Sequence, residues 1–265
     1  MIGLYKVKPR SGLLAEIDRK TPLQTDYVEP IAAAVRQIGG LLGHTLHSIY
    51  ISGDVAQRCA GSSADFEFTL VTSRALNVQE YTSLNTIRWR IEQSSDVVKR
   101  VEFDVVPLKD VTALVNIFKW GFFLKHCALC MSGDNLADSF GHFEVSWEVS
   151  KAMNDDLAGK LKDLRQKVAV ATKWGSQLDA AEEAAKRLIK AAFGLVASKE
   201  GRWEHDLQIC ADVFLVSYPE KNVEIERLFY LIQRKPVKKR AVVALMDDFG
   251  QWVLSEYARI DRKIG

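Results

Sequence analysis

The sequence predicts an α+β fold, and two observations support this prediction. Up to about residue 138, segments with the apolar spacing of amphipathic helices alternate with short apolar runs typical of strands. From residue 144 onward, the long segments have apolar residues three and four positions apart, the pattern of helices that pack together. We therefore expect a mixed sheet with flanking helices in residues 1–140 and an all-α helical bundle in residues 141–265.

The first region is predicted to alternate helices with strands. Residues 1–25 contain two prolines and are predicted to be irregular or a peripheral strand. Asp26 is a candidate cap for a first helix, which Gly39-Gly40 ends or loosens. Asp110 is a candidate cap for a helix that continues through Trp120. The other predicted elements are strands at 48–52, 65–72, 101–107 and 127–131 and a helix at 78–92.

The second region is predicted to contain only helices. Prolines at 219 and 236 mark breaks between them, because the residue before a proline disfavours the helical conformation. The predicted helices span 157–172, 178–197, 203–218, 223–233 and 237–260.

Charge and composition exclude several classes of protein. The chain has 36 Lys and Arg against 34 Asp and Glu, so its formal net charge of +2 selects neither nucleic acid nor membrane as a partner. No apolar run approaches the roughly 18 residues of a membrane span, and the first residues lack the apolar core of a signal peptide. Four cysteines are too few for a disulfide scaffold of this length. We expect a cytoplasmic protein that binds neither membrane nor nucleic acid; the sequence indicates no oligomeric state.

Residues 49–68 combine an apolar strand, a glycine turn at Gly53 and a second strand that begins with two carboxylates. Side chains alternate between the two faces of a strand, so Asp65 and Glu67 share one face, about 6–7 Å apart, and Phe66 lies on the other. The aromatic face is expected to be core. Two carboxylates at this spacing can share one hard cation or hold a pair of metal ions.

A third strand repeats this arrangement over residues 100–106. Glu102 and Asp104 share one face, and the apolar side chains share the other. Oxygen ligands on neighbouring strands beside a glycine turn suit Mg²⁺ that bridges the phosphates of a nucleotide, rather than zinc. Only one of these two carboxylates need be a ligand, and the spacing permits either.

Together these residues resemble the nucleotidyltransferase superfamily typified by DNA polymerase beta. Its pattern is a hydrophobic residue and a glycine, a spacer, Asp-x-Asp or Asp-x-Glu, and a third carboxylate on a later strand. Here the pattern is Ile51-Ser52-Gly53, the spacer, Asp65-Phe66-Glu67, and then Glu102 or Asp104. The surroundings of Glu102 and, more loosely, residues 129–136 and 186–203 are similar to aminoglycoside and spectinomycin adenylyltransferases.

The resemblance implies a role for each of these residues. Asp65 and Glu67 are expected to hold Mg²⁺ on a nucleoside triphosphate. Glu102 or Asp104 is expected to hold a second metal or to act as general base for the acceptor hydroxyl. The turn at Gly53 is expected to cradle the β- and γ-phosphates.

Three further residues are candidates for contact with the nucleotide. Arg58 either contacts phosphate or is a solvated helix arginine, and Lys186 either reaches phosphate or belongs to a charged helix face. Asp54 stands where the superfamily usually has serine. Its negative charge near phosphate is repulsive unless a cation lies between them, which brings triphosphate binding into question.

The leading hypothesis is an Mg²⁺-dependent nucleotidyltransferase. It transfers a nucleoside monophosphate, most simply AMP from ATP, to a hydroxyl of a small molecule, for example an aminoglycoside-type antibiotic, and the helical domain selects the acceptor. One alternative is transfer to RNA or protein. Another is a non-catalytic descendant that binds nucleotide or a partner protein, which Asp54 favours, and a third is a scaffold that keeps only the fold. The sequence indicates neither the acceptor nor the base of the nucleotide.

Overall fold

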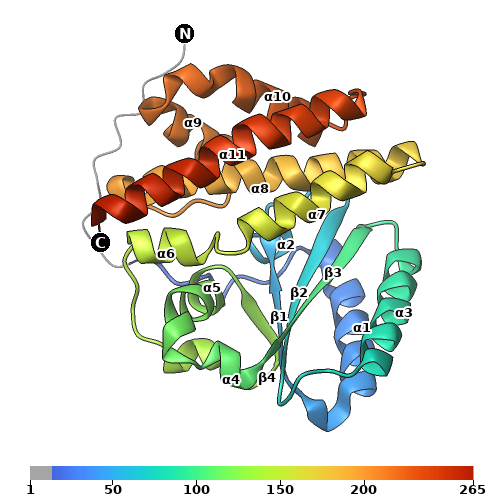
Figure 1. The fold of residues 1–265 in the computed structure, drawn as a ribbon. Helices are drawn as coiled ribbons and strands as arrows, with labels where there is room; N and C mark the ends of the chain where they lie inside the picture. The colour runs from blue at the N-terminus through green and yellow to red at the C-terminus, as the bar shows by residue number, and fades with distance from the viewer. Residues whose placement is uncertain (1–13, 265) are drawn as a thin grey trace. The chain divides into compact units, whose positions relative to one another are not determined.

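The computed structural model describes residues 14–264, which form two compact units, residues 14–143 and residues 144–264 (Figure 1). The first unit is a mixed sheet with flanking helices and the second is helical, so the predicted α+β class is confirmed. The assignment of residues 1–140 and 141–265 to two functional domains stays a prediction. No helix within residues 14–264 has both the length and the apolarity needed to cross a membrane.

The sheet of the first unit has the order β3-β2-β1-β4 within the described chain. Strand β1 (Leu46–Ser52) pairs antiparallel with both β2 (Ala64–Thr72) and β4 (Leu129–Gly133). Strand β3 (Val98–Pro107) runs parallel to β2. Parallel neighbours need a crossover connection, and the helix between these two strands provides it. Each strand overlaps a strand predicted from the sequence.

One face of the sheet is hydrophobic along its length. It is covered by α1 (Thr25–Leu42) and α3 (Val78–Ser94), which lie on the same side of the sheet in Figure 1. The fully buried ring of Phe66 packs edge-on against the rings of Tyr27 and Phe68, with centroids 6.0 Å apart in each case. Such aromatic contacts add to the area that the rings bury. This face is the main core of the unit.

The opposite face is apolar only at one end. There Tyr50, Val71 and Val106 pack against Trp120 and Leu124, which come from the segment after β3. That segment contains two short helices, α4 (Leu108–Val111) and α5 (Phe122–His126), joined by 3₁₀ and π turns. The other end of this face carries polar side chains and is the subject of the next section.

Three local predictions for the first unit are wrong. Helix α1 passes through Gly39 and Gly40 without a break. Its N-cap is Gln24, so Asp26 lies in the first turn, where its negative charge interacts favourably with the helix dipole. Asp110 lies inside α4 instead of capping a long helix. Glycine at position 121 in the π turn allows the ring of Phe143 to pack closely, because a Cβ there would lie 2.8 Å from this ring.

The beginning of the described chain is extended. Residues 14–24 contain neither helix nor strand, in agreement with the irregular alternative predicted for residues 1–25. The rest of that prediction lies outside the described residues. Strand β4 begins at Leu129 instead of Cys127, since Cys127 still caps the C-terminal end of α5.

The second unit is organised around one long helix, α8, whose alanine-rich surface packs against its neighbours. Gly194 on α8 allows close approach, because a Cβ there would clash with the hydroxyl of Tyr257. Helix α9 begins at Leu207 and not at Trp203, because the Asp206 side chain caps it by accepting from the Ile209 N–H at 2.9 Å. The helices are α6 (Trp147–Ala152), which was not predicted, α7 (Leu157–Val170), α8 (Trp174–Glu200), α9 (Leu207–Ser217), α10 (Asn222–Ile232) and α11 (Lys239–Ile264).

Candidate functional site

The polar end of the sheet brings the predicted carboxylates to one face. In the strand register, Glu67 on β2 lies between Ser52 on β1 and Glu102 on β3. Asp65 lies opposite Arg100, and Thr69 lies opposite Asp104. Cross-strand partners point to the same side of a sheet. The structure therefore gathers Asp65, Glu67, Glu102 and Asp104 on one face of two parallel neighbouring strands; their roles stay predictions.

Gly53 makes the turn beside this face, and two observations explain why glycine stands there. Its φ of +75° lies in the left-handed region that disfavours other residues. A Cβ at this position would also lie only 3.0 Å from the carboxyl carbon of Glu67. The Ser52 hydroxyl donates to Glu67 Oε2 at 3.2 Å. The backbone of the turn thus passes directly over a carboxylate that Ser52 holds in place.

Arg100 forms ion pairs with two carboxylates of the site. Its Nη2 donates to Asp65 Oδ2 at 2.9 Å, and its Nε forms an ion pair with Glu102 Oε1 at 3.1 Å. The Asp65 side chain is only 10% exposed and that of Arg100 only 25%. A carboxylate buried to this degree needs a cation nearby, since burial of an unpaired charge is costly. One guanidinium thus serves carboxylates from two strands.

The donor set fits a hard cation. Oxygen atoms of Asp65 and Glu102 converge on a single positive group, the Arg100 guanidinium, which occupies the place of such a cation. Within residues 14–264, no three His, Cys, Asp or Glu side chains already lie close enough together to hold a metal ion. Mg²⁺ is commonly held by one or two carboxylates, with phosphate oxygens and water as the other ligands. This carboxylate face fits that mode, in which the nucleotide completes the coordination.

Arg58 is part of the support for the glycine turn. It follows the short helix α2 (Gly53–Ala56) with a φ of +57°, so its interpretation as a helix arginine is wrong. Its guanidinium donates to the carbonyls of Ala56 and, at 2.6 Å, of Thr21. These bonds tie the end of α2 to the extended segment before α1. Contact between Arg58 and phosphate stays a prediction.

The other two candidates lie in different surroundings. Asp54 is exposed in the first turn of α2. Lys186 belongs to α8 in the second unit, where its Nζ lies 2.9 Å from Glu182 Oε1. Glu182 is buried and also pairs with Arg234 at 2.8 Å. Lys186 therefore has a structural partner within its own unit, and its predicted contact with nucleotide is untested.

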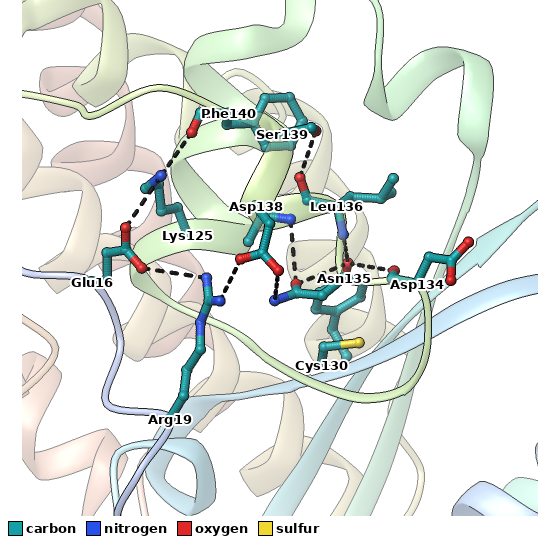
Figure 2. A network of polar contacts seen from close by, with 12 residues as sticks. Glu16, Arg19, Lys125, Cys130, Asp134, Asn135, Leu136, Asp138, Ser139 and Phe140 are labelled. Carbon is teal, nitrogen blue, oxygen red and sulfur yellow. Dashed lines mark hydrogen bonds and ion pairs between the residues drawn. The ribbon is translucent and has the colours of Figure 1, made fainter.

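A second polar network fixes the chain on the β4 side of the same unit (Figure 2). Arg19 contacts Asp138 at 2.5 Å and Glu16 at 3.4 Å, and the buried Lys125 donates to the Phe140 carbonyl at 2.7 Å. These contacts join the extended segment at the start of the described chain to the loop after β4. Arg19 and Lys125 are both paired with carboxylates within the network.

Tyr50 lies where this network meets the sheet. Its hydroxyl accepts from the Leu136 N–H at 2.7 Å and donates to the Asp134 carbonyl at 3.3 Å. Burial raises the pKa of Tyr50 to about 12. A phenol with so high a pKa stays neutral near neutral pH, so Tyr50 serves as a hydrogen-bond anchor and not as an acid or base there.

Two residues of the site were missed by sequence reasoning. Ser52 was treated only as part of the motif, although it directly precedes the glycine and shares the polar face. Arg100 lies at the start of the predicted third strand, and the motif assigns it no role. Strand alternation places Arg100 on the same face as Glu102 and Asp104, so the signal was present in the sequence.

Comparison with known proteins bears on the fold of the chain. No family model and no curated protein sequence matches the chain. Among solved structures, the chain has the fold of a nucleotidyltransferase, and the resemblance predicted from its sequence is confirmed at the level of the fold. One matching structure is spectinomycin adenyltransferase AAD(9) from Enterococcus faecialis, crystallised with ATP and spectinomycin, with a TM-score of 0.57 and 12% identity. The match covers 85% of this chain and 98% of that chain.

Proposed function

We propose that this protein is a nucleotidyltransferase that transfers a nucleoside monophosphate, most simply AMP from ATP, to a hydroxyl group of a small molecule. The observation that carries the proposal is the approach of the Gly53 turn to Glu67, with Asp65 beside it on the same strand face. The missing side chain at Gly53 lets the backbone turn approach the Glu67 carboxylate closely, and paired carboxylates beside such a turn are oxygen ligands suited to Mg²⁺. The shared fold supports this interpretation.

Each side chain of the site has a role in the proposed reaction. Asp65 and Glu67 would hold Mg²⁺ together with the phosphate oxygens, and the metal would supply Lewis-acid stabilisation of the charge on the transferring phosphoryl group. Ser52 keeps the Glu67 carboxylate oriented through its 3.2 Å hydrogen bond. Glu102 or Asp104 accepts the proton of the acceptor hydroxyl or binds a second metal. The Gly53 turn lies along the β- and γ-phosphates, and Lys186 and Arg58 are proposed phosphate contacts.

The acceptor is proposed to be a hydroxyl-bearing antibiotic of the aminoglycoside or spectinomycin type. The support is the spectinomycin adenyltransferase AAD(9) structure, which was crystallised with spectinomycin and whose chain is covered to 98% by the match. We assign the choice of acceptor to the predicted helical domain, residues 141–265. We also propose that the protein acts in the cytoplasm, where ATP and Mg²⁺ are available.

Pyrophosphate release tests this proposal. The protein is incubated with each nucleoside triphosphate, Mg²⁺ and a panel of hydroxyl-bearing antibiotics that includes spectinomycin. We expect acceptor-dependent release in the wild type and none above background in Asp65→Asn, with an unchanged circular dichroism spectrum. Arg36→Gln is a matched control, since the exposed Arg36–Glu29 pair at 2.7 Å lies away from the strands. Retained transfer in Asp65→Asn would reject the role of this carboxylate.

A second candidate function is a non-catalytic nucleotide-binding or partner-binding protein. Two observations favour it: Arg100 already neutralises Asp65, and Asp54 adds a negative charge at the turn. In that case the wild type binds nucleotide without releasing pyrophosphate, and Asp54→Ser releases none either. If Asp54→Ser instead raises pyrophosphate release above that of the wild type, the residue is a modulator of an active enzyme.

A further inference from the structure

The ion pairs of Arg100 bear on how a metal ion binds at the carboxylate face. Asp65 is nearly buried, and its partner in the strand register is Arg100 on β3. The same guanidinium also contacts Glu102, two residues further along β3 on the same face. A single side chain therefore spans the gap between two strands and links their carboxylates.

These carboxylates belong to the face that the proposed function assigns to metal binding, and the inference rests on that function. An oxygen that accepts a charge-assisted hydrogen bond at 2.9 Å cannot present the same lone pair to a metal ion. Two positive groups at that distance also repel each other strongly where water is largely excluded. Arg100 and a divalent cation thus compete for Asp65 Oδ2, the carboxylate oxygen that accepts from the guanidinium.

We propose that Arg100 is the resident cation of the carboxylate face and that a divalent metal binds there only by displacing it. In the absence of metal, Arg100 offsets the charge of Asp65 and keeps the strand ends together. Metal binding at Asp65 must break the contact between this carboxylate and the guanidinium, so the affinity for metal is lower than the oxygen ligands alone allow. The released guanidinium is then a donor for anionic ligands such as phosphate.

Metal affinity measured without nucleotide tests this proposal. Mn²⁺ replaces Mg²⁺, because the electron paramagnetic resonance signal of free Mn²⁺ reports the bound fraction directly. We expect Arg100→Gln to bind Mn²⁺ at least about fivefold more tightly than the wild type, the lower end of a typical coupling between two sites. Arg36→Gln removes an equal charge from the same unit and should bind as the wild type does. Adding Asp65→Asn to Arg100→Gln should abolish the gain.

Arg100→Lys is a second variant, which keeps the proposal testable if Arg100→Gln fails to fold. A lysine keeps the charge but lacks the planar fork that contacts both carboxylates, so it should compete less well and bind Mn²⁺ with an affinity between those of the wild type and Arg100→Gln. Equal, measurable binding by the wild type, Arg100→Lys and Arg100→Gln overturns the inference and leaves the metal site in place. Absence of Mn²⁺ binding in every variant overturns the metal site of the proposed function, and the inference with it.

Discussion

The two faces of the sheet in residues 14–143 are built for different purposes. The face under α1 and α3 buries an unbroken set of aliphatic and aromatic side chains. The opposite face is apolar near Tyr50 but carries Asp65, Glu67, Glu102 and Arg100 at its other end. The same strands therefore place the side chains that stabilise the fold on one face and the charged side chains of the candidate site on the other. Substitutions on the first face should mainly change the free energy of unfolding, and those at the polar end should mainly change ligand binding.

The largest expected effect is on the hydrophobic face. Phe66→Ala removes a fully buried ring that packs against Tyr27 and Phe68. We expect a loss of about 3–5 kcal/mol in the free energy of unfolding, measured by chemical denaturation. Val78→Ala, at an 83% exposed position, should change it by no more than about 0.5 kcal/mol. Similar losses in the two variants would contradict the placement of the core.

A smaller effect is expected at the apolar end of the opposite face. Tyr50→Phe removes the acceptor of the Leu136 N–H and leaves this donor without its partner. We expect a loss of about 1–3 kcal/mol in the free energy of unfolding. Tyr81→Phe on the exposed side of α3 is the control and should be nearly neutral. If Tyr50→Phe and Tyr81→Phe have the same free energy of unfolding, the hydrogen bonds of the Tyr50 hydroxyl do not stabilise the fold.

Gly53→Ala tests the polar end. The positive φ alone should cost about 1–2 kcal/mol of stability, and the new methyl group also presses on the Glu67 carboxylate. We therefore expect the loss in binding free energy for a non-hydrolysable ATP analogue, measured by calorimetry, to exceed the loss in the free energy of unfolding. Gly61→Ala is a control in the same connection between β1 and β2, after α2, where a Cβ meets nothing within 4 Å. Unchanged affinity in Gly53→Ala would separate the turn from nucleotide binding.

The smallest expected effect is at the N-terminal end of α3, the helix over the hydrophobic face. The Arg74 guanidinium, with the Asn77 N–H, holds the pKa of Glu80 at about 2, below its ordinary 4.5. Because the unfolded chain binds a proton more readily, this carboxylate contributes stability above pH 4.5 that is lost as the pH falls toward 2. The free energy of unfolding should therefore fall more steeply over this range in the wild type than in Glu80→Gln. Parallel pH profiles would show that the cap is not formed.

Much of the sheet could be predicted because strand alternation is a local property. The shared faces of Asp65 and Glu67, and of Glu102 and Asp104, follow from spacing within each strand. The Arg100 contact could not be derived, because it depends on the parallel register between strands that are separated by a helix. The continuation of α1 through its two glycines was also missed, since packing under the sheet overrides their low helix propensity.

The most direct test of the central claim is nucleotide binding at the polar end of the sheet. The midpoint temperature of unfolding is measured for the wild type and Asp65→Asn with a non-hydrolysable ATP analogue, with and without Mg²⁺. At ligand concentrations about 100 times the dissociation constant, binding stabilises the folded state by about 2.7 kcal/mol. We predict an Mg²⁺-dependent rise in the wild type that is lost in Asp65→Asn. No rise with any nucleoside triphosphate in the wild type, or an equal rise in both proteins, would contradict the account.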